Sequence, residues 1–171
     1  KVSLLSRLGG HALHWSNLKD QRRSGTTLPV KHDGSFFNME LQFNQSVFTV
    51  LPAKTDVRPE MVFLFELFLL RGTNNHIDRV VGWGAFPVCD GALDLLEGKF
   101  KCPLLRGHQD SRIDQFRKIE ELMSSDLDHW LSNLYFQIIK LPRYLDGQKE
   151  YEVHLQFPSN ILGSPDCFCT S

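Results

Sequence analysis

Three things are scarce in this sequence: long apolar runs, metal-type cysteine pairs and an excess of charge of one sign. The longest apolar run, residues 61–70, is interrupted by Glu66, whereas a membrane-spanning helix needs about 20 apolar residues. No Cys-x-x-Cys pair of the kind found in zinc sites occurs. The cysteines are too few for the disulfide framework of a small secreted domain, so we expect reduced thiols. The four cysteines are Cys89, Cys102, Cys167 and Cys169.

Charge is balanced, with 19 Lys and Arg against 20 Asp and Glu, a formal net charge of -1. Proteins that bind nucleic acid through phosphate neutralisation need a concentrated basic surface. The balance therefore argues against a nucleic-acid partner, although it leaves room for local basic patches.

Motifs of catalysis are also missing, because neither a nucleophile elbow nor a phosphate-binding loop is present. Two weaker arrangements involve histidine. His11 and His14 could meet Asp20 or Asp33 at a metal ion. His129, which is close to two aspartates in the sequence, could form an acid–base cluster. A solvated surface explains these residues more simply, so we predict no enzyme, no catalytic residue, no metal, no cofactor and no small-molecule substrate.

The length of 171 residues and the hydrophobic content of 42% fit one globular domain. We place this domain at residues 1–158 and a flexible tail at residues 159–171. Because the first residue is Lys1, we expect the sequence to be a piece of a longer protein.

Two apolar patterns predict strands. Apolar and polar residues alternate in residues 37–44, 99–104 and 151–157, the period of a strand with one buried face. More continuous apolar runs occupy residues 47–51, 61–70, 80–88 and 134–141, as in central strands. With a first strand at residues 2–5, the pattern predicts a mainly β protein, an antiparallel sandwich of about eight strands.

One helix is expected to interrupt this β pattern at residues 111–131, where apolar residues recur at steps of three and four. Ser111 and Asp114 resemble a capping box. The helix carries two large aromatic residues, Phe116 and Trp130, which are candidate partner-binding residues because aromatic side chains anchor many interfaces. The alternative is that the apolar stripe simply packs on the sandwich.

Residues 79–100 hold the most informative arrangement. A strand with Gly82 and Trp83 leads to a turn at Asp90, followed by Leu95, Gly98 and another strand. This arrangement resembles the C2 domain superfamily, and the spacing from Asp90 to Gly98 is similar to that in C2 domains of phosphoinositide 3-kinases. Arg58 before Pro59 and a long apolar strand is similar to C2 modules of ciliary and basal-body scaffold proteins.

The resemblance implies a calcium-independent module. Calcium-binding C2 domains carry paired aspartates in a loop, whereas the matching residues 69–78 contain Asp78 as their only acid, together with Arg71. It also implies a location in the cytoplasm, associated with the cilium or centrosome.

Basic residues supply the remaining candidate sites. Lys99 and Lys101 share one side of their strand and Arg106 follows. C2 domains often meet anionic lipids in this way, although ordinary solubility charges would look the same. Arg22 and Arg23 lie in a polar segment, residues 16–34, that we expect to be a mobile loop and count as candidate partner-binding residues.

We therefore predict a non-catalytic adaptor that binds a protein partner and, as a second partner, an anionic membrane surface. The alternative is the regulatory C2 domain of a lipid-handling enzyme such as a phosphoinositide kinase. A small free-standing enzyme on a β framework is a third hypothesis, which would need a deep pocket with converging histidines and acids.

Overall fold

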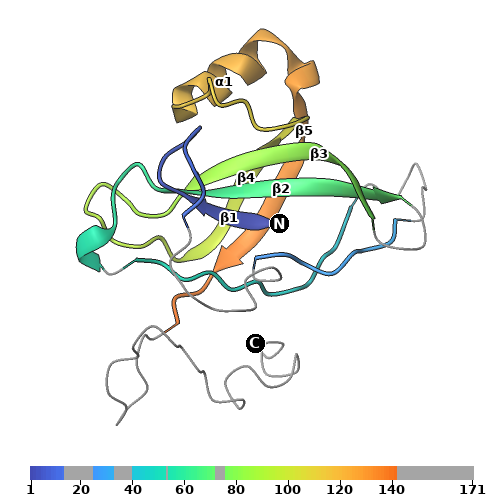
Figure 1. The fold of residues 1–171 in the computed structure, drawn as a ribbon. Helices are drawn as coiled ribbons and strands as arrows, with labels where there is room; N and C mark the ends of the chain where they lie inside the picture. Colours follow the sequence, from blue (N-terminus) through green and yellow to red (C-terminus); the bar gives the residue numbers. More distant parts are fainter. Residues whose placement is uncertain (14–24, 33–39, 53, 72–75, 142–171) are drawn as a thin grey trace, which may run out of the picture.

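The computed structural model describes residues 1–13, 25–32, 40–52, 54–71 and 76–141. These residues form one five-stranded antiparallel sheet in which the spatial order of the strands follows their order in the chain (Figure 1). The strands are β1 (Val2–Leu5), β2 (Val62–Arg71), β3 (His76–Pro87), β4 (Gly98–Arg106) and β5 (Trp130–Ile138). The helix α1 (Phe116–Ser125) and the 3-10 turns η1 (Lys54–Asp56) and η2 (Leu127–His129) complete the described elements.

The sheet has an apolar core on each side. One core lies between the sheet and α1 and includes Trp83, Leu105 and Ile119, all buried. The other lies on the opposite side of the sheet and includes Phe63 and Val88. Because side chains alternate between the two sides of a strand, β1, β2 and β3 contribute to both cores. Burial of this apolar area stabilises the sheet at about 25 cal/mol per Å².

Two glycines let β3 and its neighbours approach closely. A Cβ atom on Gly82 would lie 2.5 Å from the Leu131 side chain, and one on Gly84 would lie 2.6 Å from the backbone oxygen of Pro103. Gly84 requires glycine, because the backbone of Pro103 cannot move aside, whereas at Gly82 the flexible end of the Leu131 side chain would have to shift.

The helix packs on the sheet through one apolar side. Ile119 is buried, and Leu122 and Met123 pack against the same core. The predicted capping box is wrong, because α1 begins after Gln115, whose side chain makes no capping hydrogen bond. Asp114 instead pairs with Lys118 at 2.7 Å.

The mainly β prediction is confirmed, with one helix between β4 and β5. The predicted helix bounds, residues 111–131, are wrong, because α1 covers only Phe116–Ser125 and Trp130, expected on the helix, begins β5. The predicted strand at residues 47–51 is wrong, because these residues form no strand. They belong to a segment, residues 40–52, that passes beneath the sheet (Figure 1) and reaches its lower core through Leu51. Apolar residues can pack on a sheet by their side chains alone, without the backbone ladder that defines a strand.

Other predicted elements are matched only in part. The last described strand begins at Trp130 and ends at Ile138, so it starts earlier than the predicted residues 134–141. Residues 40–44 form no strand, whereas residues 37–39, 151–157 and 159–171 lie outside the described residues. The described part of the chain thus shows one sheet, and a second sheet stays a prediction.

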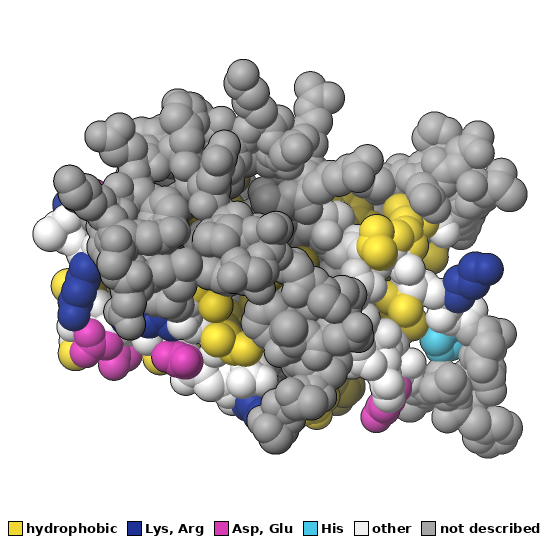
Figure 2. Space-filling model, turned by 90° about the horizontal axis from the view of Figure 1, so that it is seen from below, with side chains coloured by type: hydrophobic (Ala, Val, Ile, Leu, Met, Phe, Trp, Pro, Cys, Tyr) yellow, Lys and Arg dark blue, Asp and Glu magenta, His cyan; other side chains and the backbone are white. Residues whose placement is uncertain are grey.

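Seen from below, hydrophobic side chains of the described residues gather at the centre and right of the lower face, and charged side chains lie mainly towards its rim (Figure 2). Within the part of the chain that the structure describes, no helix combines the length and apolar composition that a bilayer crossing requires.

Candidate functional site

The antiparallel pair β4 and β5 presents a polar surface that carries an exposed aromatic ring. Lys99 lies opposite Gln137, and Lys101 lies opposite Tyr135. All four residues are exposed, and Tyr135 exposes 72% of its surface. We call these four residues the lysine–tyrosine face.

A direct contact links the two strands within this face. The Lys101 Nζ atom lies 5.9 Å from the centroid of the Tyr135 ring. A cation above an aromatic ring gains about 0.5–1 kcal/mol at an exposed site. The contact directs the Lys101 ammonium group across β5, and so places positive charge close to the edge of the sheet.

The lysine–tyrosine face points outwards because aromatic side chains pack on the opposite side of the same strands. Phe100 and Phe136 lie opposite each other in the ladder and belong to an aromatic cluster with Phe86, whose ring centroid lies 4.7 Å from that of Phe100 and 5.1 Å from that of Phe136. Alternation then turns Lys101 and Tyr135 to the other side. The sequence correctly predicted that Lys99 and Lys101 share one exposed side.

Arg106 does not join the two lysines. It lies at the other end of β4, and its parity in the strand differs from theirs. Its Nε atom donates a hydrogen bond to the backbone oxygen of Asp128 at 3.0 Å. The three basic residues predicted from the sequence therefore do not form a single patch.

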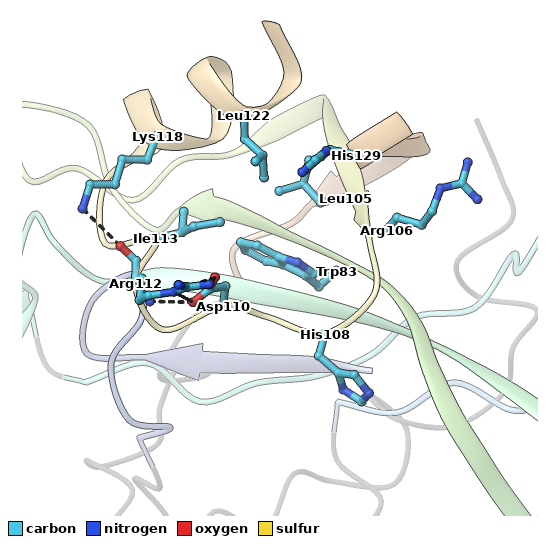
Figure 3. A pocket seen from close by; sticks show the side chains of 10 residues that line it. All are labelled: Trp83, Leu105, Arg106, His108, Asp110, Arg112, Ile113, Lys118, Leu122 and His129. Carbon is cyan, nitrogen blue, oxygen red and sulfur yellow. Dashed lines mark hydrogen bonds and ion pairs between the residues drawn. The ribbon is translucent and has the colours of Figure 1, made fainter. Parts of the chain in front are cut away.

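Arg106 instead lines a pocket of about 320 Å³ between α1, the segment before α1 and the sheet. Figure 3 shows the Trp83 ring at the centre of this pocket, with Ile113 and Leu122 near it and His108 pointing away. Trp83 and Leu105 are buried, so the floor is apolar.

Two charged groups at the pocket rim, Asp110 and Arg112, are paired with each other. Arg112 forms a bidentate ion pair with Asp110, with hydrogen bonds between 2.7 and 3.1 Å. These hydrogen bonds lower the pKa of Asp110 to about 2, and they raise the pKa of Arg112. On this rim, cation and anion largely compensate each other, which favours a structural role for the pair in fixing residues 110–112.

The histidine and aspartates near the end of α1 also have a structural explanation. The Asp126 side chain accepts a hydrogen bond from the backbone N–H of Asp128 at 2.9 Å, which caps η2. His129 Nδ1 lies 3.7 Å from Asp126 Oδ2. Among the described residues, no group of three or more His, Cys, Asp and Glu side chains could hold a metal ion.

Two of the cysteines are described, and both are free and buried. Burial raises the pKa of the Cys102 thiol to about 12, so this thiol stays protonated and unreactive at neutral pH. Cys167 and Cys169 lie outside the described residues.

The predicted partner-binding residues are only partly visible. Phe116 begins α1 and Trp130 begins β5, and their exposed fractions are 39% and 37%. Arg22 and Arg23 lie outside the described residues. Sequence reasoning missed Tyr135 as a site residue, because its position opposite Lys101 depends on a strand register that the sequence pattern leaves open.

Comparison with known proteins adds no relative to this geometry. The chain matches no protein-family model, no curated protein and no solved structure.

Proposed function

We propose that this chain is a non-catalytic adaptor module that binds a partner protein through the lysine–tyrosine face. The observation that carries the proposal is Tyr135, an exposed aromatic side chain whose ring lies 5.9 Å from the Lys101 Nζ atom. Exposed tyrosine combines apolar contact area with a hydroxyl group and loses little conformational freedom on binding, which is why it is common among interface anchors.

The finer assignment to a C2-like sandwich is part of this proposal. It is supported by the path of residues 40–52 beneath the sheet (Figure 1), where a second layer would lie. The C2 family itself depends on the resemblance of residues 79–100 alone, and a location in the cytoplasm at the cilium or centrosome depends on the resemblance of Arg58, Pro59 and the apolar strand that follows. The same resemblance would fit the regulatory part of a lipid-handling enzyme.

Affinity capture with matched variants tests the adaptor function. The immobilised chain is compared with the double variant Lys101→Glu, Tyr135→Ala and with Arg117→Ala, which alters an exposed ion pair on α1. We expect at least one protein to be retained by the unmodified chain and by Arg117→Ala but lost with the double variant. Identical sets of retained proteins for all three would refute the proposal.

A second function, binding to anionic lipid headgroups, is favoured by one specific observation. Lys99 and Lys101 are both exposed on the same side of β4, and each lysine close to an anionic membrane contributes about 1 kcal/mol. The test is sedimentation with phosphatidylcholine vesicles, with and without phosphatidylserine, at low salt. We expect binding only with phosphatidylserine and its loss in Lys99→Glu, Lys101→Glu; unchanged sedimentation of this variant would exclude lipid binding by these lysines.

A further inference from the structure

The two edges of the sheet differ in the backbone hydrogen bonds that other described parts of the chain make to them. At the β1 edge, the backbone N–H of Val2 donates to Gly25 and that of Leu13 donates to the oxygen of Leu4, so other parts of the chain cover this strand. At the β5 edge, no further strand pairs with the sheet among the residues that the structure describes (Figure 1).

The composition of β5 is unusual for an edge strand. Its nine residues, WLSNLYFQI, include no charged residue, no proline and no glycine. Natural edge strands usually carry such residues, because an unprotected row of N–H and C=O groups pairs readily with another strand. One register irregularity occurs near its beginning, between Leu104 and Leu105 of the partner strand, and leaves the rest of the edge regular.

The backbone directions in β4 follow from one hydrogen bond. The N–H of Gly107 donates to the oxygen of Val81 at 2.9 Å, which identifies a hydrogen-bonded pair between β3 and β4. Hydrogen-bonding direction alternates along an antiparallel strand. The backbone groups of Leu105, Pro103 and Lys101 therefore point towards β3. Because Pro103 faces β3, its lack of an N–H removes no hydrogen bond between β4 and β5.

The same alternation fixes the outer edge of β5. The backbone groups of Leu104, Cys102 and Phe100 point towards β5, where their ladder partners are residues 132, 134 and 136. It follows that the backbone groups of Asn133, Tyr135 and Gln137 point away from β4. These are the positions whose side chains share the side of the lysine–tyrosine face.

The chemistry on the two sides of this edge defines what would fit it. On the upper side, Lys101 reaches over Tyr135, and Lys99 is exposed on the same side of β4. On the lower side, Leu134, Phe136 and Ile138 are half-buried. An added strand would therefore need acidic residues on one side and apolar residues on the other.

We propose that β5 accepts, as an added sixth strand, an extended segment of a partner protein in which acidic and apolar residues alternate. The inference rests on the proposed adaptor function and deepens it, since it names the chemistry and the binding mode of the partner. The added strand gains backbone hydrogen bonds at the outward amides, and alternate side chains supply specificity.

Amide hydrogen exchange on the full chain tests the mode directly. The probe is a capped peptide as long as β5 in which Val alternates with Glu; the control peptide carries Lys in place of Glu. In the free chain, the amides of Asn133, Tyr135 and Gln137 should exchange faster than their neighbours. The Val–Glu peptide should slow these three amides by at least about tenfold, whereas the Val–Lys peptide should not.

Matched variants at one position make the test specific. Gln137→Pro removes one outward N–H without touching the ladder to β4, and edge strands tolerate proline at such positions. Gln137→Ala keeps the N–H. We expect the Val–Glu peptide to bind Gln137→Pro at least about fivefold more weakly than Gln137→Ala, the loss of one hydrogen bond.

Two results would overturn strand addition. Slow exchange of the three amides in the free chain would mean that the chain itself or a second copy already covers the edge, and sedimentation would identify the second copy. Peptide binding that is equal in Gln137→Pro and Gln137→Ala, yet lost in Lys101→Glu, Tyr135→Ala, would mean that a partner docks by side chains, so the adaptor function would stand without strand addition. Absence of peptide binding would refute strand addition, whereas only the capture experiment decides the adaptor function.

Discussion

Among the described residues, Trp83 has the largest fully buried side chain. It belongs to the core between the sheet and α1, and its ring lies at the centre of the pocket (Figure 3). The sequence pattern marked Gly82 and Trp83 as a family-like pair, whereas the structure gives both a packing role. The Trp83 side chain thus packs between the sheet and α1.

Replacing Trp83 should therefore be costly. Trp83→Ala is expected to lower the free energy of unfolding by about 3–5 kcal/mol, because the deleted ring leaves a cavity that the rigid sheet cannot fill. Denaturant unfolding followed by circular dichroism measures the change. Trp130→Ala, at a residue that is 37% exposed, is the control and should lose clearly less; equal losses would contradict the central position of Trp83.

The ion pair of Asp110 and Arg112 makes stability depend on pH. Hydrogen bonds from Arg112 lower the pKa of Asp110 from 3.8 to about 2 in the folded chain. A carboxylate with a lowered pKa stabilises the fold above its unfolded pKa, and this contribution is lost as the pH falls through the folded pKa. Asp110→Asn should thus be less stable than the unmodified chain at neutral pH.

The difference between the two proteins should shrink as the pH falls from about 4 towards about 2, measured as melting temperature in a pH series. Glu120→Gln, at an exposed position on α1, is the control and should show no such convergence. A pH-independent difference for Asp110→Asn would mean that the pair does not act through its charge.

At the scale of secondary-structure elements, β3 and β4 approach each other closely at Gly84. Gly84 lies against the backbone of Pro103, and backbone atoms cannot move aside as a flexible side chain can. The aromatic cluster of Phe86, Phe100 and Phe136 joins β3, β4 and β5, so displacement of β4 would disturb it.

Gly84→Ala should consequently destabilise the fold by at least about 2 kcal/mol, since overpacking forces a backbone shift. The matched control is Gly91→Ala, where nothing lies within 4 Å of the added Cβ atom; its effect should stay within about 0.5 kcal/mol. Thermal unfolding of both variants measures the difference. Similar melting temperatures for the two would show that β3 and β4 can separate freely.

The elements also show how far sequence reasoning reaches. Period-two alternation located β4 and separated its exposed lysines from its buried side, because alternation is a local property of any strand. Alternation failed for residues 40–44, and the continuous apolar run failed for residues 47–51, because neither segment pairs with the sheet. Strand register is not local, so the contact between Lys101 and Tyr135 could not be predicted. The position of β5 at an edge likewise depends on the whole sheet.

At the scale of the whole molecule, the resemblance to C2 domains predicts indifference to calcium. The described residues hold no cluster of acids able to bind a metal ion, and Arg71 lies within the matching residues 69–78. Calcium that bound the folded chain would raise its melting temperature by mass action. We expect equal melting temperatures with calcium and with a chelator; a rise of several degrees would contradict calcium independence.

The spatial order of the strands has a consequence for how the chain folds. β2 to β5 follow one another in sequence, whereas β1 must wait for residues 6–61 to close a long loop before it can pair with β2. Closing a long loop costs entropy before the contacts it permits are made. The N-terminal strand should therefore join last and detach first, so that a nascent or heated molecule passes through a four-stranded form with the β2 edge uncovered.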